Sequence, residues 1–211
     1  SLLDADGVYR LQGVARVFVN EKEARQAITS QSIHDGDVVI LHGMGAMADG
    51  MPETLELTNA LRYLSKTTNV PVITDARFSG VSTGPCIGHA SPEGIVGGPI
   101  GKIQNGDLLE VIIDCKKLSG KVNLIGSSGK KFSPEQGTKI LKSRKPNPRM
   151  FEKLEGLPPE VLLWAKLAQA SGGADNGFTW IPEEIAARLD AGMRLKNFQE
   201  RHPFLASIVG M

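Results

Sequence analysis

Residues 74–93, with the sequence TDARFSGVSTGPCIGHASPE, bring many chemistry-bearing side chains into one short segment. They include three serines, one histidine, one cysteine, one arginine and two acids. Three glycines and two prolines interrupt the segment, which argues against a regular helix or strand over its length. A long loop of this kind in a compact domain is usually functional or disordered. We therefore look here first for a catalytic or binding site.

Ser79, inside this loop, and Glu53, on the preceding connection, are the two residues with the most direct chemical use. Each follows an apolar run that we expect to be a buried strand, and neighbouring strands would place both at their C-terminal ends, where sites on open sheets form. A carboxylate there can hold Mg²⁺ through oxygen. The ordinary alternatives are favourable charge in a first helical turn for Glu53 and a turn hydroxyl bonded to its own backbone for Ser79.

Two other polar residues of the loop, Arg77 and His89, have both a functional and a structural interpretation. Arg77 can clamp a carboxylate with two parallel hydrogen bonds, or it can form an ion pair at the surface or with Asp75. His89 can be a ligand, a substrate contact or a structural hydrogen-bonding residue. Cys86 fits a small packing residue.

The stretch GVSTG, residues 80–84, matches the nucleophile elbow of hydrolases, with Ser82 as the nucleophile. That elbow joins a strand directly to a helix. Here four residues separate Asp75 from the motif and Pro85 follows it, so a turn role for Ser82 is favoured over a hydrolase.

The stretch GMGAMA, residues 43–48, is similar to a dinucleotide-binding loop. In such a loop the helix opens within the glycine motif, whereas here the helix signal starts only at Pro52. The acid that binds ribose lies about 20 residues further on, but Asp75 is 30 residues beyond Gly45. A plain glycine loop is favoured over a nicotinamide site.

The elements that must position these residues can be read from apolar periodicity and turn signals. Asn20 predicts the N-cap of a helix over 21–29, and Ser133 with Gln136 predicts a capping box for a helix that begins at Pro134. Asn105-Gly106 predicts a type I′ hairpin between two β runs. We expect no regular alternation of strands and helices up to about residue 130. The remaining expected elements are strands within 7–20, 36–42 and 70–75, helices over 52–66, 158–170 and 182–193, and a hairpin that continues to 126.

Composition excludes several classes of protein. The chain has 211 residues, 41% of them hydrophobic, and a net charge of +1, so nothing in the whole-chain charge favours nucleic acid or membrane. No apolar run is long enough to span a bilayer, and we expect no signal peptide. The two cysteines, Cys86 and Cys115, fit a reducing compartment, which predicts a cytoplasmic protein. The absence of an initiator methionine suggests a fragment of a longer chain.

The sequence ITDARFSGVSTGPCIGHASPEGIVGGPI resembles the C-terminal signature of the dihydroxy-acid and phosphogluconate dehydratase family. DGMPE, residues 49–53, resembles that family's GMPE element and ends 26 residues before Ser79; IQNGDLLEVIID resembles the following segment. The sequence departs from the family pattern at Ala76 and Val81, which replace glycines, and in HGMGAMADGMPE. That last departure, with the similarity of residues 118–141 and of LLWAKLAQASGG to the xylonate dehydratase branch, points to sugar acids.

The resemblance implies an α/β (mixed) fold. It implies a swivelling β-barrel-like β/β/α domain over residues 1–130, which would carry half of the active site. Residues 131–211 would form a helical C-terminal extension packed on that domain. An N-terminal domain of the same chain, absent here, would hold most of the Mg²⁺ ligands and an iron–sulfur cluster, either 2Fe-2S or 4Fe-4S.

The resemblance also implies roles for individual residues. Ser79 would be the base that takes the C2 proton, and Glu53 would be the Mg²⁺ ligand supplied by this domain. The substrate-binding or supporting residues would be Arg77, Gly80, His89 and Asp75. Mg²⁺ would hold the substrate carboxylate and C2 oxygen, and the cluster iron would act on the leaving C3 hydroxyl. Glycines such as Gly80 would let the backbone approach an anion closely.

These residues and the resemblance together predict the C-terminal domain of a hydro-lyase that converts a xylonate-like aldonate to a 2-keto-3-deoxy acid. We expect the 211 residues alone to be folded but inactive, the full-length enzyme to be a homo-oligomer, and no partner among nucleic acids or membranes. The alternatives are a dihydroxy-acid dehydratase of branched-chain amino-acid synthesis and a non-catalytic swivelling or binding module.

Overall fold

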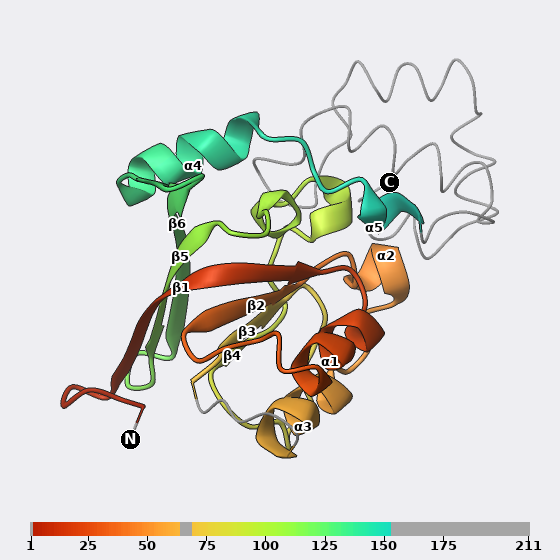
Figure 1. The fold of residues 1–211 in the computed structure, drawn as a ribbon, viewed down its shortest axis with the longest axis vertical. Helices are drawn as coiled ribbons and strands as arrows, with labels where there is room; N and C mark the ends of the chain where they lie inside the picture. Colours follow the sequence, from red (N-terminus) through yellow and green to blue (C-terminus); the bar gives the residue numbers. More distant parts are fainter. Residues whose placement is uncertain (1, 64–68, 153–211) are drawn as a thin grey trace.

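The computed structural model describes residues 2–63 and 69–152 (Figure 1). The helices predicted over 158–170 and 182–193, and the rest of the expected extension, lie outside the described residues. The elements along the chain are β1 (Val8–Phe18), α1 (Glu21–Thr29), β2 (Asp37–Leu41), α2 (Ala46–Asp49), α3 (Leu55–Tyr63), β3 (Val72–Thr74), β4 (Cys86–Ile87), η1 (Gly94–Val96), η2 (Pro99–Lys102), β5 (Leu108–Asp114), β6 (Ser119–Ser127), β7 (Lys130–Lys131), α4 (Pro134–Ser143) and α5 (Arg149–Glu152).

One mixed sheet of seven strands, in the order β4-β3-β2-β1-β5-β6-β7, organises the described residues and confirms the α/β class. It remains open, because no ladder joins β4 to β6 in this part of the chain. The sheet nevertheless curls: a Cβ on Gly120 of β6 would lie 3.3 Å from the Ile87 side chain of β4. The expected barrel-like domain therefore takes the form of a curled open sheet.

The first four strands run parallel, and the connections between β1, β2 and β3 contain helices. The prediction of no regular β–α alternation was therefore wrong for this half of the sheet. Apolar runs too short to show a period identify a buried strand but not its direction. The second half is antiparallel, with β5 pairing both β1 and β6.

Side-chain alternation along β2 divides the core between the two faces of the sheet. Val39 and Leu41 point to the face covered by α1 and α3, which pack against each other below the sheet in Figure 1. Val38 and Ile40 point to the opposite, concave face, where they meet residues of β5 and β6 such as Leu109 and Leu124. All five residues of β2 are buried, as a central parallel strand requires.

Helix α1 begins as predicted, because the Asn20 side chain accepts the Glu23 N–H at 2.8 Å. Helix α3 begins at Leu55 rather than at Pro52. Residues 52–54 instead pair with the loop after β3, as described below. The Leu57 N–H, one of those left unpaired at the helix start, donates to Glu21 Oε1 at 2.7 Å.

The Asn105-Gly106 prediction was wrong in its turn type and its partner strand. The residues before it form the 3₁₀ helix η2, not a strand. Gly106 has φ +84°, but Asn105 does not have the positive φ that a type I′ turn requires. Asn105 instead accepts the Val17 N–H through its side chain at 2.7 Å. The hairpin that does form joins β5 to β6.

Helix α4 is attached directly to the sheet. The predicted capping box of Ser133 and Gln136 is present. Gly137 lies so close to β6 that a Cβ there would be 1.8 Å from the Leu124 carbonyl oxygen, and Ile140 and Leu141 pack against the concave core. The domain boundary at residue 130 stays a prediction. In the described residues no helix is long and apolar enough to cross a membrane.

Candidate active site

The two segments that carry Glu53 and Ser79 lie side by side. Glu53 and Arg77 form an isolated parallel bridge. The Thr54 N–H donates to the Arg77 carbonyl at 3.0 Å, and the Arg77 N–H donates to the Pro52 carbonyl at 3.3 Å. The structure therefore pairs Glu53 directly with the loop that holds Ser79. Ser79 lies two residues after Arg77, the bridge partner of Glu53.

Glu53 is not in a first helical turn, because α3 starts two residues later. Its side chain is 45% exposed and pairs with the Arg77 guanidinium, with Oε1 3.6 Å from Nη1. Arg77 is itself held by a hydrogen bond from its Nε to the Met51 carbonyl at 3.0 Å. The alternative pair of Arg77 with Asp75 does not form in the structure. Glu53 thus presents a carboxylate at the surface beside a fixed cation.

Ser79 opens a tight turn at the tip of the loop. The Ser82 N–H donates to the Ser79 carbonyl at 3.0 Å, and the Val81 N–H approaches Ser79 Oγ at 3.4 Å. Ser79 is half-buried and Gly80 is exposed. Ser82 occupies the turn position that the sequence favoured, and its Oγ is buried with no hydrogen-bond partner in the described residues.

Asp75 does not face solvent. Its side chain accepts three backbone N–H groups: Gly43 at 3.0 Å, Met44 at 3.0 Å and Gly94 at 2.8 Å. It is 1% exposed. Asp75, at the start of the loop, therefore links the glycine segment after β2 with Gly94, at the end of the loop.

His89 and Cys86 occupy supporting positions on the returning arm of the loop. His89 is exposed and has φ +54°, and its backbone N–H donates to the Ala76 carbonyl at 2.8 Å. Cys86 packs against the helix-covered face of the core. Burial raises the pKa of the Cys86 thiol to about 11, so it is not a thiolate at neutral pH.

Glu93 is a residue of this region that sequence reasoning missed. It is 3% exposed and its carboxylate accepts the Met47 N–H at 3.0 Å. Burial raises its pKa to about 7; the N–H groups of Met47 and Ala48 lower it and the charge of Asp75 raises it further. The motif SPE contains Glu93, but only the fold shows that it binds the glycine segment 46 residues earlier in the chain.

The residues present fit a share of a Mg²⁺ site and do not fit an iron–sulfur cluster. Glu53 offers the hard oxygen donor that Mg²⁺ prefers. The described residues contain no group of three or more His, Cys, Asp or Glu side chains placed to hold a metal. Cysteine thiolates hold such clusters, and this chain has only Cys86 in β4 and Cys115 beyond β5.

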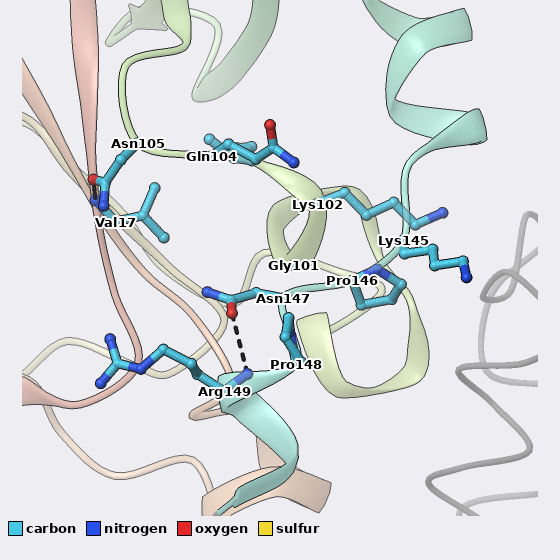
Figure 2. Close-up of a pocket in the computed structure, with 11 residues that line it drawn as sticks. Val17, Gly101, Lys102, Gln104, Asn105, Lys145, Pro146, Asn147, Pro148 and Arg149 are labelled. Atoms are coloured by element: carbon cyan, nitrogen blue, oxygen red, sulfur yellow. Dashed lines mark hydrogen bonds between the residues drawn. The ribbon is translucent and has the colours of Figure 1, made fainter.

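A separate cavity of about 400 Å³ lies beside the C-terminal end of β1 (Figure 2). Its lining includes Val17, Asn105 and the basic residues Lys102, Lys145 and Arg149. Arg149 already pairs with Glu23 at 2.6 Å. None of the predicted site residues lines this cavity, and we place the candidate site at the Glu53–Arg77 bridge because the chemistry-bearing loops meet there.

The described residues thus form a curled α/β sheet in which a bridge joins the segment of Glu53 to the loop of Ser79. Comparison with known families identifies the class of protein that has this domain. The model of the dihydroxy-acid/6-phosphogluconate dehydratase C-terminal domain matches residues 3–151. The chain belongs to this family, as its sequence resemblance predicted.

Two similar proteins are D-xylonate dehydratases of Escherichia coli K12. YjhG is 44% identical over 90% of this chain and 29% of its own length, and YagF is 42% identical over 92% of this chain and 30% of its own length. The dihydroxy-acid dehydratase of Archaeoglobus fulgidus is 43% identical over 56% of this chain and 22% of its own length. The chain thus spans less than a third of the length of these relatives, as a C-terminal part.

Proposed function

We propose that this chain is the C-terminal part of a cytoplasmic hydro-lyase that dehydrates a sugar acid of the xylonate type to a 2-keto-3-deoxy acid. The observation that carries the proposal is the bridge between Glu53 and Arg77, which sets a half-exposed carboxylate beside the Ser79 turn. The D-xylonate dehydratases match about nine-tenths of this chain, whereas the dihydroxy-acid dehydratase matches little more than half. This difference favours a sugar acid over the branched-chain alternative.

In this proposal Ser79 is the general base. A serine hydroxyl is far too weak an acid to ionise near neutral pH without help. A nearby divalent cation and backbone N–H groups favour the charged form, and the Val81 N–H already approaches Ser79 Oγ at 3.4 Å. The exposed Gly80 leaves the turn open to a ligand, since no atom lies within 4 Å of a Cβ built there.

Glu53 would contribute one oxygen ligand to Mg²⁺, and the N-terminal part of the full-length chain would contribute the others and the cluster. When bound, Mg²⁺ supplies Lewis-acid stabilisation of negative charge on the substrate carboxylate and the C2 oxygen. Arg77, held by its hydrogen bond to the Met51 carbonyl, would lie beside Glu53 and could donate two parallel hydrogen bonds to the substrate carboxylate. His89 and Asp75 would hold the loop in shape.

The reaction balances as loss of one water molecule. Ser79 removes the proton from C2, the electron pair of that C–H bond forms the C2–C3 double bond, and the C3–O bond breaks with its electron pair going to oxygen. The departing hydroxide takes up the proton that Ser79 removed and leaves as water, which returns Ser79 to its charged form. The resulting enol tautomerises to the 2-keto acid. This chain's own part is removal of the C2 proton and orientation of the substrate.

The test uses the full-length enzyme and a panel of aldonates and 2,3-dihydroxy acids, with 2-keto acid formation as the readout. We expect Ser79→Ala to abolish turnover while the visible absorption of the cluster is retained, and Ser82→Ala, the matched control, to retain turnover. Retained activity in Ser79→Ala would exclude Ser79 as the base. Turnover by the 211 residues alone would overturn the division of the site between two domains and would favour another function for this chain.

A further inference from the structure

Glu93 is a buried carboxylate that the proposed chemistry does not use. It accepts backbone N–H groups from both Met47 and Ala48 at the start of α2. The fit is close, because a Cβ on Gly45 would lie 1.8 Å from Glu93 Oε2. The glycine segment, residues 43–50, therefore wraps directly around this carboxylate.

Asp75 binds the first part of the same segment through the Gly43 and Met44 N–H groups. Asp75 lies just before the Ser79 turn and Glu93 lies at the far end of the loop, so the two carboxylates bracket it. The glycine segment that they hold continues through Met51 and Pro52 to Glu53. The two carboxylates thus connect the segment leading to Glu53 with both ends of the loop carrying Ser79.

We propose that Glu93 is a positioning residue for this site, one that sets the segment ending at Glu53 against the Ser79 loop. The inference rests on the proposed function, because it concerns how the Mg²⁺ ligand and the base are placed. It requires the ionised carboxylate, since only that form presents acceptor lone pairs on both oxygens without a proton.

The surroundings of Glu93 make its charge state sensitive to pH. Burial raises the pKa of Glu93, and Asp75, the charged group that faces it among the described residues, raises it further. Helix α2 contributes backbone donors, and α5 contributes the apolar Met150 near Gly94. With a pKa of about 7, Glu93 is ionised at pH 8 and mostly protonated at pH 6. The hydrogen bonds from the Met47 and Ala48 N–H groups are therefore charge-assisted at pH 8 and lose that charge at pH 6.

The experiment measures Mg²⁺ binding to the full-length protein by calorimetry at pH 8 and pH 6. We expect Glu93→Gln to raise the Kd for Mg²⁺ at least tenfold at pH 8. The glutamine NH₂ group is a hydrogen-bond donor and cannot accept the Met47 or Ala48 N–H that it would face. The ratio of variant to wild-type Kd should fall toward one at pH 6, where wild-type Glu93 is itself neutral. Glu135→Gln, on the exposed first turn of α4, is the matched control and should bind Mg²⁺ as wild type does.

An unchanged Kd in Glu93→Gln, or a ratio that does not vary with pH, would overturn the inference. If Glu93→Gln fails to fold, Glu93→Asp keeps the charge and should bind Mg²⁺ more weakly than wild type, and wild-type affinity would overturn the inference. Glu53→Gln separates the two proposals: if it too leaves Mg²⁺ binding unchanged, the proposed function itself has failed.

Discussion

Replacing Arg144 should remove a large share of the stability of the described domain. Arg144 is the C-cap residue of α4; its side chain, 12% exposed, pairs with the side chain of Asp107, which is 1% exposed. Arg144 Nη2 donates to Asp107 Oδ1 at 3.0 Å and to Ser127 Oγ at 2.8 Å, and Nη1 donates to the Lys102 carbonyl at 3.3 Å. Arg144→Ala leaves the Asp107 carboxylate buried without its cation.

Breaking a buried ion pair by removing one partner costs about 3–5 kcal/mol. For a domain of this size each kcal/mol lowers Tm by about 2–4 °C, so we expect a fall of about 6–20 °C. The assays are thermal unfolding of the 211-residue chain, which gives Tm, and urea unfolding, which gives the free energy change; both are followed by circular dichroism. The m value is compared between variants to confirm that only stability has changed.

Arg149→Ala is the matched control, because Arg149 pairs with Glu23 at the surface, where the two side chains are 47% and 35% exposed. An exposed pair contributes about 0–1 kcal/mol. Adding Asp107→Asn to Arg144→Ala should restore part of the loss by removing the buried charge. A cost below about 1 kcal/mol for Arg144→Ala, or one equal to that of Arg149→Ala, would refute the reasoning. It would mean that the Arg144–Asp107 pair does not stabilise the packing of α4 on the sheet.

Three further predictions concern stability. Gly45→Ala should lower the free energy of unfolding by about 3 kcal/mol, measured by urea unfolding, because its Cβ would displace the Glu93 carboxylate from its two donors; Gly80→Ala, with open space at its Cβ, should cost less than half as much. Asn20→Ala should cost about 1 kcal/mol through loss of the N-cap of α1, and no change in urea midpoint would contradict this. Because the pKa of Glu93 is raised from 4.5 to about 7, its contribution to stability is complete below pH 4.5 and is lost as pH rises to about 7, by up to about 3 kcal/mol. Thermal unfolding at pH 5 and pH 8 should show this slope in wild type and not in Glu93→Gln, and an equal slope in both would assign it to another group.

Features with local causes could be predicted from the sequence. The N-cap at Asn20 and the capping box at Ser133 depend on hydrogen bonds within three residues, and both are confirmed. The strands β2 and β3 follow from short apolar runs, whose burial needs no knowledge of partners. The candidate site segment was chosen because its motifs resemble a family; the family is confirmed, and the roles of the site residues stay predictions.

Features that depend on distant partners could not be predicted in this way. The parallel direction of the first four strands is a property of pairing, not of one run. Asn105 uses its side chain for Val17, a partner 88 positions away, and so gives up the turn that its local sequence favours. The start of α3 moved from Pro52 to Leu55 because residues 52–54 pair with Arg77. Glu93 was missed for the same reason, since its donors lie in a segment far away in sequence.

The unequal exposure of the two cysteines makes this chain ready for spectroscopic work without further mutation. Cys115 is exposed beyond β5, at the edge of the sheet opposite the serine turn, because β5 runs antiparallel to β1 and Val8 pairs with Asp114. Cys86 is half-buried and its pKa of about 11 leaves almost none of it as the reactive thiolate at pH 7. A maleimide dye would therefore label Cys115 selectively. Energy transfer to a second dye on the remainder of the full-length protein would test the swivelling that the sequence resemblance predicts for this domain.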